Sequence, residues 1–231
     1  MENSKIITIE GLIKRFPMGR GEFTALNGID LNFGKGEFAG VVGPSGSGKT
    51  TLLNIIGSLD TPSEGRAIVL GQSIGELSHK QAAGLRNMHY GFIFQTYNLL
   101  PVYTVFENVE FPLLLMGMPA EGRKKAVLEA LEWVGLSDKE KSKPRQLSGG
   151  EGQRVAIARA MVKKPEIVLA DEPTANLDAK NSHNILETME KLNRELETTF
   201  IFATHDDKVI GYMRRIITLE DGKVSKDETV K

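Results

Sequence analysis

The sequence contains no cysteine among its 231 residues. Disulfide scaffolds, thiolate zinc sites and cysteine nucleophiles are therefore excluded together. Neither sign of charge is in excess, because 29 lysines and arginines stand against 30 aspartates and glutamates, for a formal net charge of −1. A nearly neutral chain lacks the broad basic field of a dedicated nucleic-acid-binding protein, although a local basic patch is still compatible with it. We therefore expect no nucleic acid among its partners.

Segments that would place the chain in a membrane are also missing. The longest uncharged run, residues 87–106, has the length of a membrane span, but it contains amides, a histidine and a proline. These groups are costly to bury in hydrocarbon. Residues 1–10 are charged and lack the apolar core of an export signal. We expect a cytoplasmic chain that reaches a membrane only through a partner.

Apolar segments of strand length alternate with segments of helical periodicity, which is typical of an α/β fold with a largely parallel sheet. The length fits one large or two small domains. Prolines and glycines punctuate residues 95–122, and we interpret approximately residues 96–160 as a helical insertion into the α/β core. Strands are predicted at residues 6–9, 29–33, 38–42, 167–170 and 200–203, and helices at 50–56, 127–134, 151–162 and 185–196.

A glycine-rich segment lies between an apolar strand and a predicted helix. Residues 43–50 read GPSGSGKT and match the pattern G-x-x-x-x-G-K-[ST] in full. Small residues let backbone N–H groups turn inward around an anion, Lys49 supplies a charge for the β- and γ-phosphates, and the Thr50 hydroxyl can ligate Mg²⁺. The alternative is a plain glycine turn with a solvated lysine. The predicted nucleotide-binding residues of this loop are Gly43, Ser45, Gly46, Ser47, Gly48, Lys49, Thr50 and Thr51.

Two adjacent carboxylates, Asp171 and Glu172, follow the apolar strand at residues 167–170, and Pro173 then forces a change of direction. In phosphate-loop proteins a carboxylate at such a strand end holds Mg²⁺, and Asp171 fits that role. Glu172 is the candidate base that orients and deprotonates the attacking water. The alternative for both is a pair of solvated carboxylates.

Residues 147–151 read LSGGE and begin a predicted helix. In physical terms they form either a second anion site at a helix N-terminus or a capping serine with a flexible hinge. With this segment the chain resembles the ATP-binding cassette ATPases, whose signature motif LSGGE matches. The resemblance covers nearly the whole chain and depends on an ordered set: the phosphate loop, Gln95, LSGGE, Asp171-Glu172, Asn176-Leu177-Asp178 and His205.

The resemblance implies one ATPase domain over residues 1–231. Its expected fold is a RecA-like phosphate-loop NTPase core with a helical subdomain and a small antiparallel β region. The expected ligands are ATP and Mg²⁺. The expected catalytic residues are Glu172, His205, Gln95 and Lys49, and the expected Mg²⁺ ligands are Thr50, Gln95 and Asp171.

The resemblance also assigns roles to residues outside the phosphate loop. Phe16 resembles the aromatic residue that stacks on adenine, and the alternative is a core aromatic. Gln95 resembles the lid glutamine, which reaches Mg²⁺ and the attacking water and senses the partner. His205 resembles the switch histidine at the γ-phosphate, and Asp178 the residue that communicates between the two sites of a dimer.

A single set of motifs implies an ATP-dependent homodimer, in which Ser148 and Gly150 of one subunit contact the ATP bound to the other. Gly152 is a departure from the family, which often has a longer polar residue there.

The chain lacks the inserts of the DNA-repair and chromosome members and the second cassette of the translation members. We therefore expect integral membrane transporter subunits as partners, on the cytoplasmic face of the inner membrane. Residues 92–101 and 170–178 are most similar to the lipoprotein-releasing and macrolide-export group, which implies lipoprotein, peptide or drug cargo. An ATP-gated regulator of a membrane protein, as in cell-division cassettes, an amino-acid importer ATPase and a nucleotide kinase are the alternatives.

Overall fold

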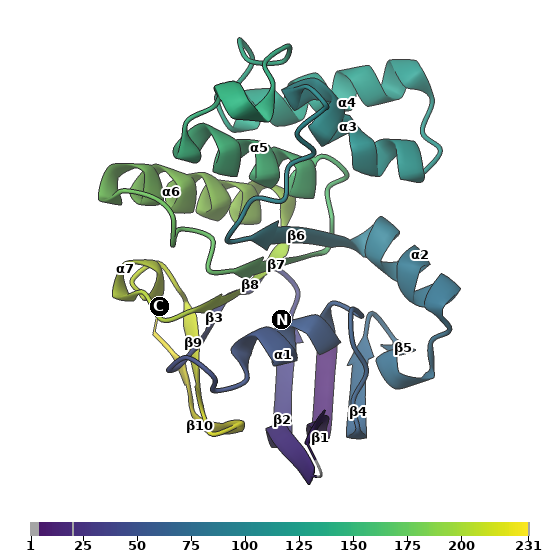
Figure 1. The fold of residues 1–231 in the computed structure, drawn as a ribbon, viewed down its shortest axis with the longest axis vertical. Helices are drawn as coiled ribbons and strands as arrows, with labels where there is room; N and C mark the ends of the chain where they lie inside the picture. The colour runs from purple at the N-terminus through teal and green to yellow at the C-terminus, as the bar shows by residue number, and fades with distance from the viewer. Residues whose placement is uncertain (1–4, 20, 231) are drawn as a thin grey trace. The chain divides into compact units, whose positions relative to one another are not determined.

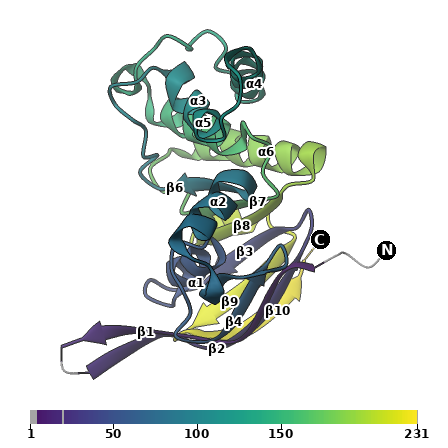
Figure 2. The ribbon, with the colours of Figure 1, turned by 90° about the vertical axis from the view of Figure 1, so that its right-hand side faces the viewer.

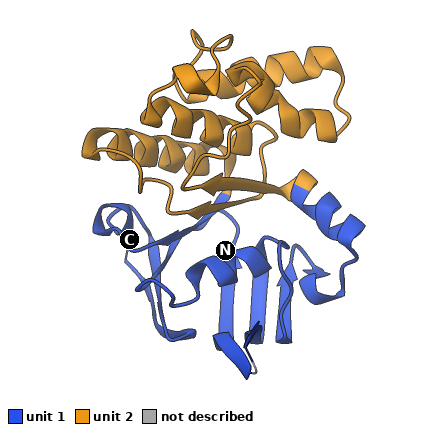
Figure 3. Ribbon diagram, in the orientation of Figure 1, with its two compact units in different colours: residues 1–86, 199–231 blue, residues 87–198 orange. Residues whose placement is uncertain are grey.

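A computed structural model of the chain describes residues 5–19 and 21–230. The first four residues of the segment inspected for an export signal lie outside this range. The chain divides into two compact units, coloured separately in Figure 3. The first unit comprises residues 1–86 and 199–231, and the second comprises residues 87–198.

The first unit contains an antiparallel sheet with the strand order β2-β1-β4-β5 (Figure 1). Its strands are β1 (Lys5–Met18), β2 (Gly21–Gly34), β4 (Glu64–Val69) and β5 (Gln72–Ser73). Strands β1 and β2 form a long hairpin, seen side by side in Figure 2. Ile7, Ile9 and Leu12 of β1 are buried, as are Ile29 and Leu31 of β2. This sheet is the small antiparallel region that the sequence predicts, but its hairpin is longer than the predicted strands.

A second set of strands in the first unit runs in the order β10-β9-β3-β8. Strand β3 pairs in parallel with both β8 and β9, whereas β10 pairs with β9 in an antiparallel hairpin. All five residues of β3 are buried, as expected for a central parallel strand. The elements are β3 (Phe38–Val42), β8 (Thr199–Thr204), β9 (Arg215–Glu220), β10 (Lys223–Thr229), α1 (Lys49–Ile56), η1 (Ile74–Glu76) and α7 (Asp207–Ile210). Helix α2 (His79–His89) begins in this unit.

The second unit contains a parallel pair of strands, four complete α-helices and the short 3₁₀ helix η2. The strands are β6 (Tyr90–Phe94) and β7 (Ile167–Asp171). Between them in the chain come α3 (Val105–Leu115), α4 (Ala120–Trp133), η2 (Pro144–Gln146) and α5 (Gly149–Met161), and α6 (Ala179–Leu196) follows β7. Helix α5 packs against α3, α4, α6 and β6, and most of its residues are buried for that reason.

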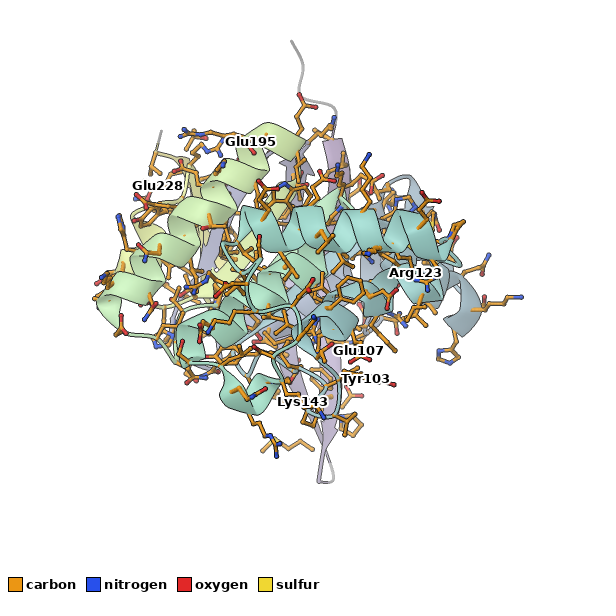
Figure 4. All side chains as sticks on the ribbon, turned by 90° about the horizontal axis from the view of Figure 1, so that it is seen from above. Tyr103, Glu107, Arg123, Lys143, Glu195 and Glu228 are labelled. Carbon is orange, nitrogen blue, oxygen red and sulfur yellow. The ribbon has the colours of Figure 1, made fainter. Side chains whose placement is uncertain are left out.

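Local side chains determine where these helices begin. Thr104 caps α3, with its hydroxyl accepting from the Glu107 N–H, while the Glu107 carboxylate accepts from the Thr104 N–H at 2.7 Å. This reciprocal capping box satisfies donors that a helix N-terminus otherwise leaves unpaired. Figure 4 shows Tyr103, Glu107 and Lys143 around this helix start. The backbone N–H and side chain of Thr104, and then the positive charge of Lys143, hold the pKa of Glu107 below its usual value.

The predicted α/β organisation with a helical insertion is present, but the stretch at residues 95–122 contains a helix that the sequence analysis did not predict. Helix α3 has Pro112 in its interior. A proline normally argues against a helix, yet here the capping box and the buried Val105, Val109 and Leu113 maintain it. Helices α2 and α7 and strands β4, β5, β6, β9 and β10 were not predicted either. No helix among residues 5–19 and 21–230 is long and apolar enough to cross a membrane.

Candidate nucleotide-binding site

The glycine-rich loop follows β3 and ends where α1 begins. Gly48 has a φ of +104° and Gly43 a φ of +146°, values that a residue with a side chain rarely adopts. A Cβ on Gly48 would lie 2.6 Å from the carbonyl oxygen of Ala25, and one on Gly43 would overlap the carbonyl oxygen of Leu219. Glycine is therefore required at both positions for backbone conformation and for space.

Lys49, the first residue of α1, is folded back over the loop. Its side-chain Nζ donates to the carbonyl oxygens of Gly43 and Pro44 at 2.8 and 2.9 Å, and the residue is only 8% exposed. The Ser47 hydroxyl is buried and has no hydrogen-bond partner in the described part of the chain. A buried cation, a buried donor without an acceptor and a helix N-terminus together suit a phosphate group. Ser45, Gly46 and Thr50 are exposed, whereas Thr51 is half-buried.

The turn between β9 and β10 is hydrogen-bonded to this loop. The Gly222 N–H donates to the Ser47 carbonyl at 3.2 Å, and the Gly222 carbonyl accepts from the Asn27 N–H at 2.8 Å. Gly222 has a φ of +72°, as the tight turn between β9 and β10 requires. The sequence analysis missed this support, and the only local signal for it is the pair Asp221-Gly222, which is typical of a hairpin turn.

His205 directly follows β8, and Gly43 directly follows β3. Because Val42 and Thr204 are register partners in the parallel pair β3–β8, the loop and His205 leave the same edge of the sheet from neighbouring strands. His205 is exposed. The structure thus brings together two of the segments that the sequence singles out, within the first unit.

Phe16 lies near the end of β1, opposite Phe23 of β2, and its side chain is not part of the buried core, being 37% exposed. The Nζ of Lys14 lies 5.0 Å from the centroid of its ring. Lys14 is itself held by Asp60 and by the carbonyl oxygen of Thr61. No sequence pattern predicts the role of Lys14, because its two partners are far along the chain.

In the second unit, Gln95 and Glu172 stand at neighbouring strand ends. Phe94 of β6 and Asp171 of β7 are register partners, so the residues that follow them leave the sheet side by side. Gln95 is exposed, and its backbone carbonyl accepts a hydrogen bond from Asn176 Nδ2 at 2.9 Å. Glu172 is half-buried and has a φ of +46°, a left-handed conformation that is uncommon outside glycine. Strained residues of this kind are concentrated at functional sites.

The LSGGE segment forms the start of α5. The Ser148 hydroxyl accepts from the Glu151 N–H at 3.3 Å, and the Glu151 carboxylate accepts from the Ser148 N–H at 2.8 Å. These bonds form a capping box, and the backbone N–H of Ser148 lowers the pKa of Glu151. Ser148 and Gly149 are exposed, whereas Gly150 is buried against Asn181 of α6.

Asp178 caps α6, and its carboxylate accepts from the backbone and side chain of Asn181 at 2.8 and 2.7 Å. The Asn181 N–H therefore lowers the pKa of Asp178. Within the described ranges, no group of three or more histidine, aspartate and glutamate side chains is arranged to hold a metal. The predicted Mg²⁺ ligands, the Thr50 hydroxyl, the Gln95 side-chain amide and the Asp171 carboxylate, offer the oxygen donors that this ion takes in proteins.

Comparison with known proteins identifies the class. A family model described as ABC transporter matches residues 26–175, which is more than half of the chain. The lipoprotein-releasing system ATP-binding protein LolD of Pseudoalteromonas translucida (strain TAC 125) is 45% identical over 227 residues, covering 98% of each chain. The macrolide export ATP-binding/permease protein MacB 1/2 of Paracoccus denitrificans (strain Pd 1222) is 42% identical over 96% of this chain and 33% of that longer protein.

Solved structures agree with this result. The dimeric structure of the ABC transporter cassette MJ0796 of Methanocaldococcus jannaschii matches with a TM-score of 0.90 and 42% identity, covering 97% of this chain and 99% of that one. A dimeric post-hydrolysis state of the same cassette, bound to ADP and Pi, matches with a TM-score of 0.90 and 41% identity.

The chain belongs to the ABC transporter family. It is an ATP-binding cassette ATPase of the group that includes LolD and MacB. The predicted phosphate-loop NTPase fold, the family resemblance and the ATPase class are confirmed, while the roles of individual site residues remain predictions.

Proposed function

We propose that this chain is the ATP-hydrolysing subunit of a transporter, and that it dimerises around two ATP to drive integral membrane subunits. The proposed cargo is a lipoprotein, peptide or drug, since the relatives include a lipoprotein-releasing and a macrolide-export protein. The observation that carries the ATPase proposal is the phosphate loop, in which the buried Lys49 ammonium and the buried Ser47 hydroxyl lie at the start of a helix. The proposed location is the cytoplasmic face of the inner membrane, reached through those subunits.

The proposed reaction is attack of water on the γ-phosphate of ATP. The backbone N–H groups of the loop, Lys49 and His205 bind and orient the phosphates, so catalysis is mostly positioning and charge stabilisation. Phe16 stacks on the adenine. Mg²⁺, held by Thr50, Asp171 and Gln95, would neutralise charge on the phosphate oxygens when bound. Glu172 orients the water and accepts its proton, a role that its fixed left-handed backbone at the end of β7 supports.

The proposed dimer completes each site with the start of α5 from the other subunit. Ser148 and Gly149 are exposed at that helix start, and Gly150 is buried beside Asn181. A helix N-terminus is a favourable partner for phosphate oxygens. Asp178, next to this surface at the start of α6, is the proposed link between the two sites.

Replacement of Glu172 by Gln tests both parts of the proposal. Glutamine keeps the shape of the side chain but cannot accept the proton, so ATP turnover should fall by at least two orders of magnitude, as for loss of general-base catalysis. ATP binding should persist, and light scattering after gel filtration with ATP and Mg²⁺ should show a dimer. Addition of Lys49→Ala to the same chain should abolish the dimer. A Glu172→Gln chain that stays monomeric with ATP bound would contradict the composite site.

The membrane partner can be sought with the same variant. The affinity-tagged Glu172→Gln chain is expressed in its native host, and the membranes are solubilised with ATP present. A co-purifying polytopic membrane protein, absent when Lys49→Ala is added, supports the transporter. Recovery of nucleic acid or of soluble partners alone contradicts it.

A further inference from the structure

The turn after Gln95 has an unusual backbone. Tyr97 and Asn98 are consecutive residues in the left-handed region, with φ of +59° and +49°. For a residue such as tyrosine this conformation costs free energy, and it persists only where the surrounding structure holds it. Local hydrogen bonds contribute, from the Asn98 N–H to the Thr96 carbonyl at 2.6 Å and from Thr96 Oγ1 to Asn98 Oδ1 at 3.0 Å. These bonds lie within the turn, so support from another element must come from a different contact.

Arg159 of α5 provides that support. Its guanidinium donates from Nη1 to the Asn98 carbonyl and from Nη2 to the Tyr97 carbonyl, both at 2.6 Å. A planar guanidinium can hold two acceptors in a fixed geometry, whereas lysine cannot. The side chain is half-buried, and burial lowers the pKa of Arg159. One residue of α5 thus binds both strained peptide units of the turn.

The ring of Tyr97 lies against the beginning of the same helix. A Cβ on Gly152 would lie 3.1 Å from Tyr97 Cδ2 and 3.3 Å from Cε2, and one on Gly149 would lie 3.2 Å from the tyrosine hydroxyl. Residues three apart share a face of a helix, so these two glycines together leave the space that the ring fills. Gly152, the position at which this chain departs from its family, therefore has a steric reason to be glycine.

A third contact joins the turn to the segment after β7. Asn176 Nδ2 donates a hydrogen bond to the backbone carbonyl of Gln95 at 2.9 Å. In the same region Gln153 of α5 donates from Nε2 to the Pro173 carbonyl at 2.7 Å, and both groups are buried. All of these contacts join residues of the second unit.

We infer that Tyr97 and Arg159 are positioning residues that fasten the loop carrying Gln95 to the helix carrying Ser148 and Gly150. The inference rests on the proposed function, since it concerns how two parts of that site act together. Gln95, which faces a subunit's own nucleotide, and the LSGGE helix start, which faces the partner's nucleotide, then move as one body. Any displacement of residues 96–103 therefore moves the helix start with them. Gly152 allows this coupling because it leaves room for the Tyr97 ring.

The absence of native cysteine makes a direct distance measurement simple. Cysteines introduced at Val102, a 71% exposed residue of the same loop, and at Arg154, on α5, carry spin labels whose separation is measured by pulsed electron resonance. In the otherwise native chain the distance distribution should be narrow. Gly152→Val should broaden it at least twofold, because the branched side chain displaces the ring. Valine is no worse a helix former than glycine, so a loss of helix propensity cannot be the cause.

Gly84→Val is the matched control. Gly84 also lies within a helix, α2, but a Cβ there would meet nothing within 4 Å. This variant should leave the distribution unchanged. Tyr97→Ala and Arg159→Met should each broaden the distribution, and Tyr97→Ala combined with Gly152→Val should broaden it no more than the larger single effect. That non-additivity is expected of residues that share one contact.

ATP turnover provides a second measurement. Gly152→Val and Arg159→Met should each lower kcat by about tenfold, a typical size for a disrupted contact network. The Kd for ATP of the monomer should change less than twofold, because the glycine-rich loop of the first unit is untouched. Tyr97→Phe, which keeps the ring, should retain the native kcat. If Gly152→Val does not fold, Gly152→Ala and Tyr97→Ala make the same test.

Two results would overturn the inference: a distribution that stays narrow in Gly152→Val or Arg159→Met, or a kcat that falls equally in Gly84→Val. Failure of the proposed function has a different signature. In that case the native chain neither hydrolyses ATP nor dimerises with it, whereas the distance distribution, which needs no nucleotide, remains informative.

Discussion

Lys14 and Phe16 form a cation–π pair near the end of β1, with the lysine Nζ 5.0 Å from the ring centroid. Lys14 is 9% exposed and donates to Asp60 at 2.5 Å and to the Thr61 carbonyl at 2.8 Å. The ammonium is therefore fixed in position, and it limits the movement of the ring. One ring face lies against Lys14, and the 37% exposure of Phe16 leaves surface for a ligand.

Replacement of Lys14 by Met should weaken ATP binding. Loss of a cation–π contact worth about 0.5–1 kcal/mol corresponds to a rise of about two- to fivefold in the Kd for ATP. The Kd for tripolyphosphate, which has no adenine, should not change. Phe16→Ala should have a larger effect of the same kind, and Phe16→Tyr a small one. An equal rise in the Kd for ATP and in the Kd for tripolyphosphate would show that Lys14 supports the whole site and does not act through the Phe16 ring.

Replacement of Lys49 by Ala should abolish most ATP turnover, because the cation proposed for the β- and γ-phosphates is lost. Removal of the bonds to the Gly43 and Pro44 carbonyls also loosens the loop. A fall in kcat/KM of at least about a hundredfold is expected, corresponding to a charged hydrogen-bond partner in a site of fixed geometry. Steady-state phosphate release measures it, and near-native turnover would contradict the phosphate role.

Gly48 and Gly46 provide a matched pair of substitutions. Both have positive φ, of +104° and +82°, but a Cβ on Gly48 would lie 2.6 Å from the Ala25 carbonyl, whereas one on Gly46 would meet nothing within 4 Å. Gly46→Ala should lower the free energy of unfolding by about 1–2 kcal/mol, the cost of a left-handed conformation. Gly48→Ala should lower the free energy of unfolding by a larger amount, because the added methyl group also meets the Ala25 carbonyl. Urea denaturation of the two variants checks the order, and equal losses would mean that β2 can move away from the loop.

Replacement of Thr104 by Ala should lower the free energy of unfolding by about 1 kcal/mol, as is typical for the loss of a helix N-cap. The hydroxyl of Thr104 accepts from the Glu107 N–H, and its removal leaves that donor without its partner. Thr104→Ser is the control and should keep native stability, because serine caps as well as threonine. Thermal unfolding of the three chains makes the comparison. A destabilised serine variant would assign the effect to the threonine methyl group.

Lys163, just after α5, should make stability depend on pH. Burial lowers the pKa of Lys163 from 10.5 to about 8, against the opposing effect of Glu166. Between pH 8 and 10.5 the unfolded chain holds the proton that the folded chain has released, so stability rises with pH across this window. The native chain should gain up to about 1.4 kcal/mol per pH unit there relative to Lys163→Met. Denaturation at pH 8, 9 and 10 measures how the free energy of unfolding of each chain changes with pH. The same change in the native chain and in Lys163→Met would refute the prediction.

The sequence predicts those parts of the fold that depend on neighbouring residues. Strand β3 is five consecutive apolar residues before a glycine, and the phosphate loop is a local pattern. Helix α3 escaped prediction because Pro112 argues against it locally, while the packing of Val109 and Leu113 that maintains it comes from elsewhere in the second unit.

The support of the site is equally non-local. Lys14 and Asp60 are 46 positions apart, and Arg159 reaches Asn98 across 61. Neither pair has a signature in the sequence, because each residue taken alone is an ordinary charged side chain. Motifs therefore predict which residues meet the ligand, but not which residues hold them in place.

The contact between Gly222 and Ser47 has a consequence for the order in which the protein is made. The phosphate loop, residues 43–50, is synthesised long before two of its neighbours, the Gly222 N–H and the Leu219 carbonyl. A nascent chain therefore holds an unbraced loop until residues 219–222 have left the ribosome. Its ability to capture nucleotide is tied in this way to the arrival of the β9–β10 turn.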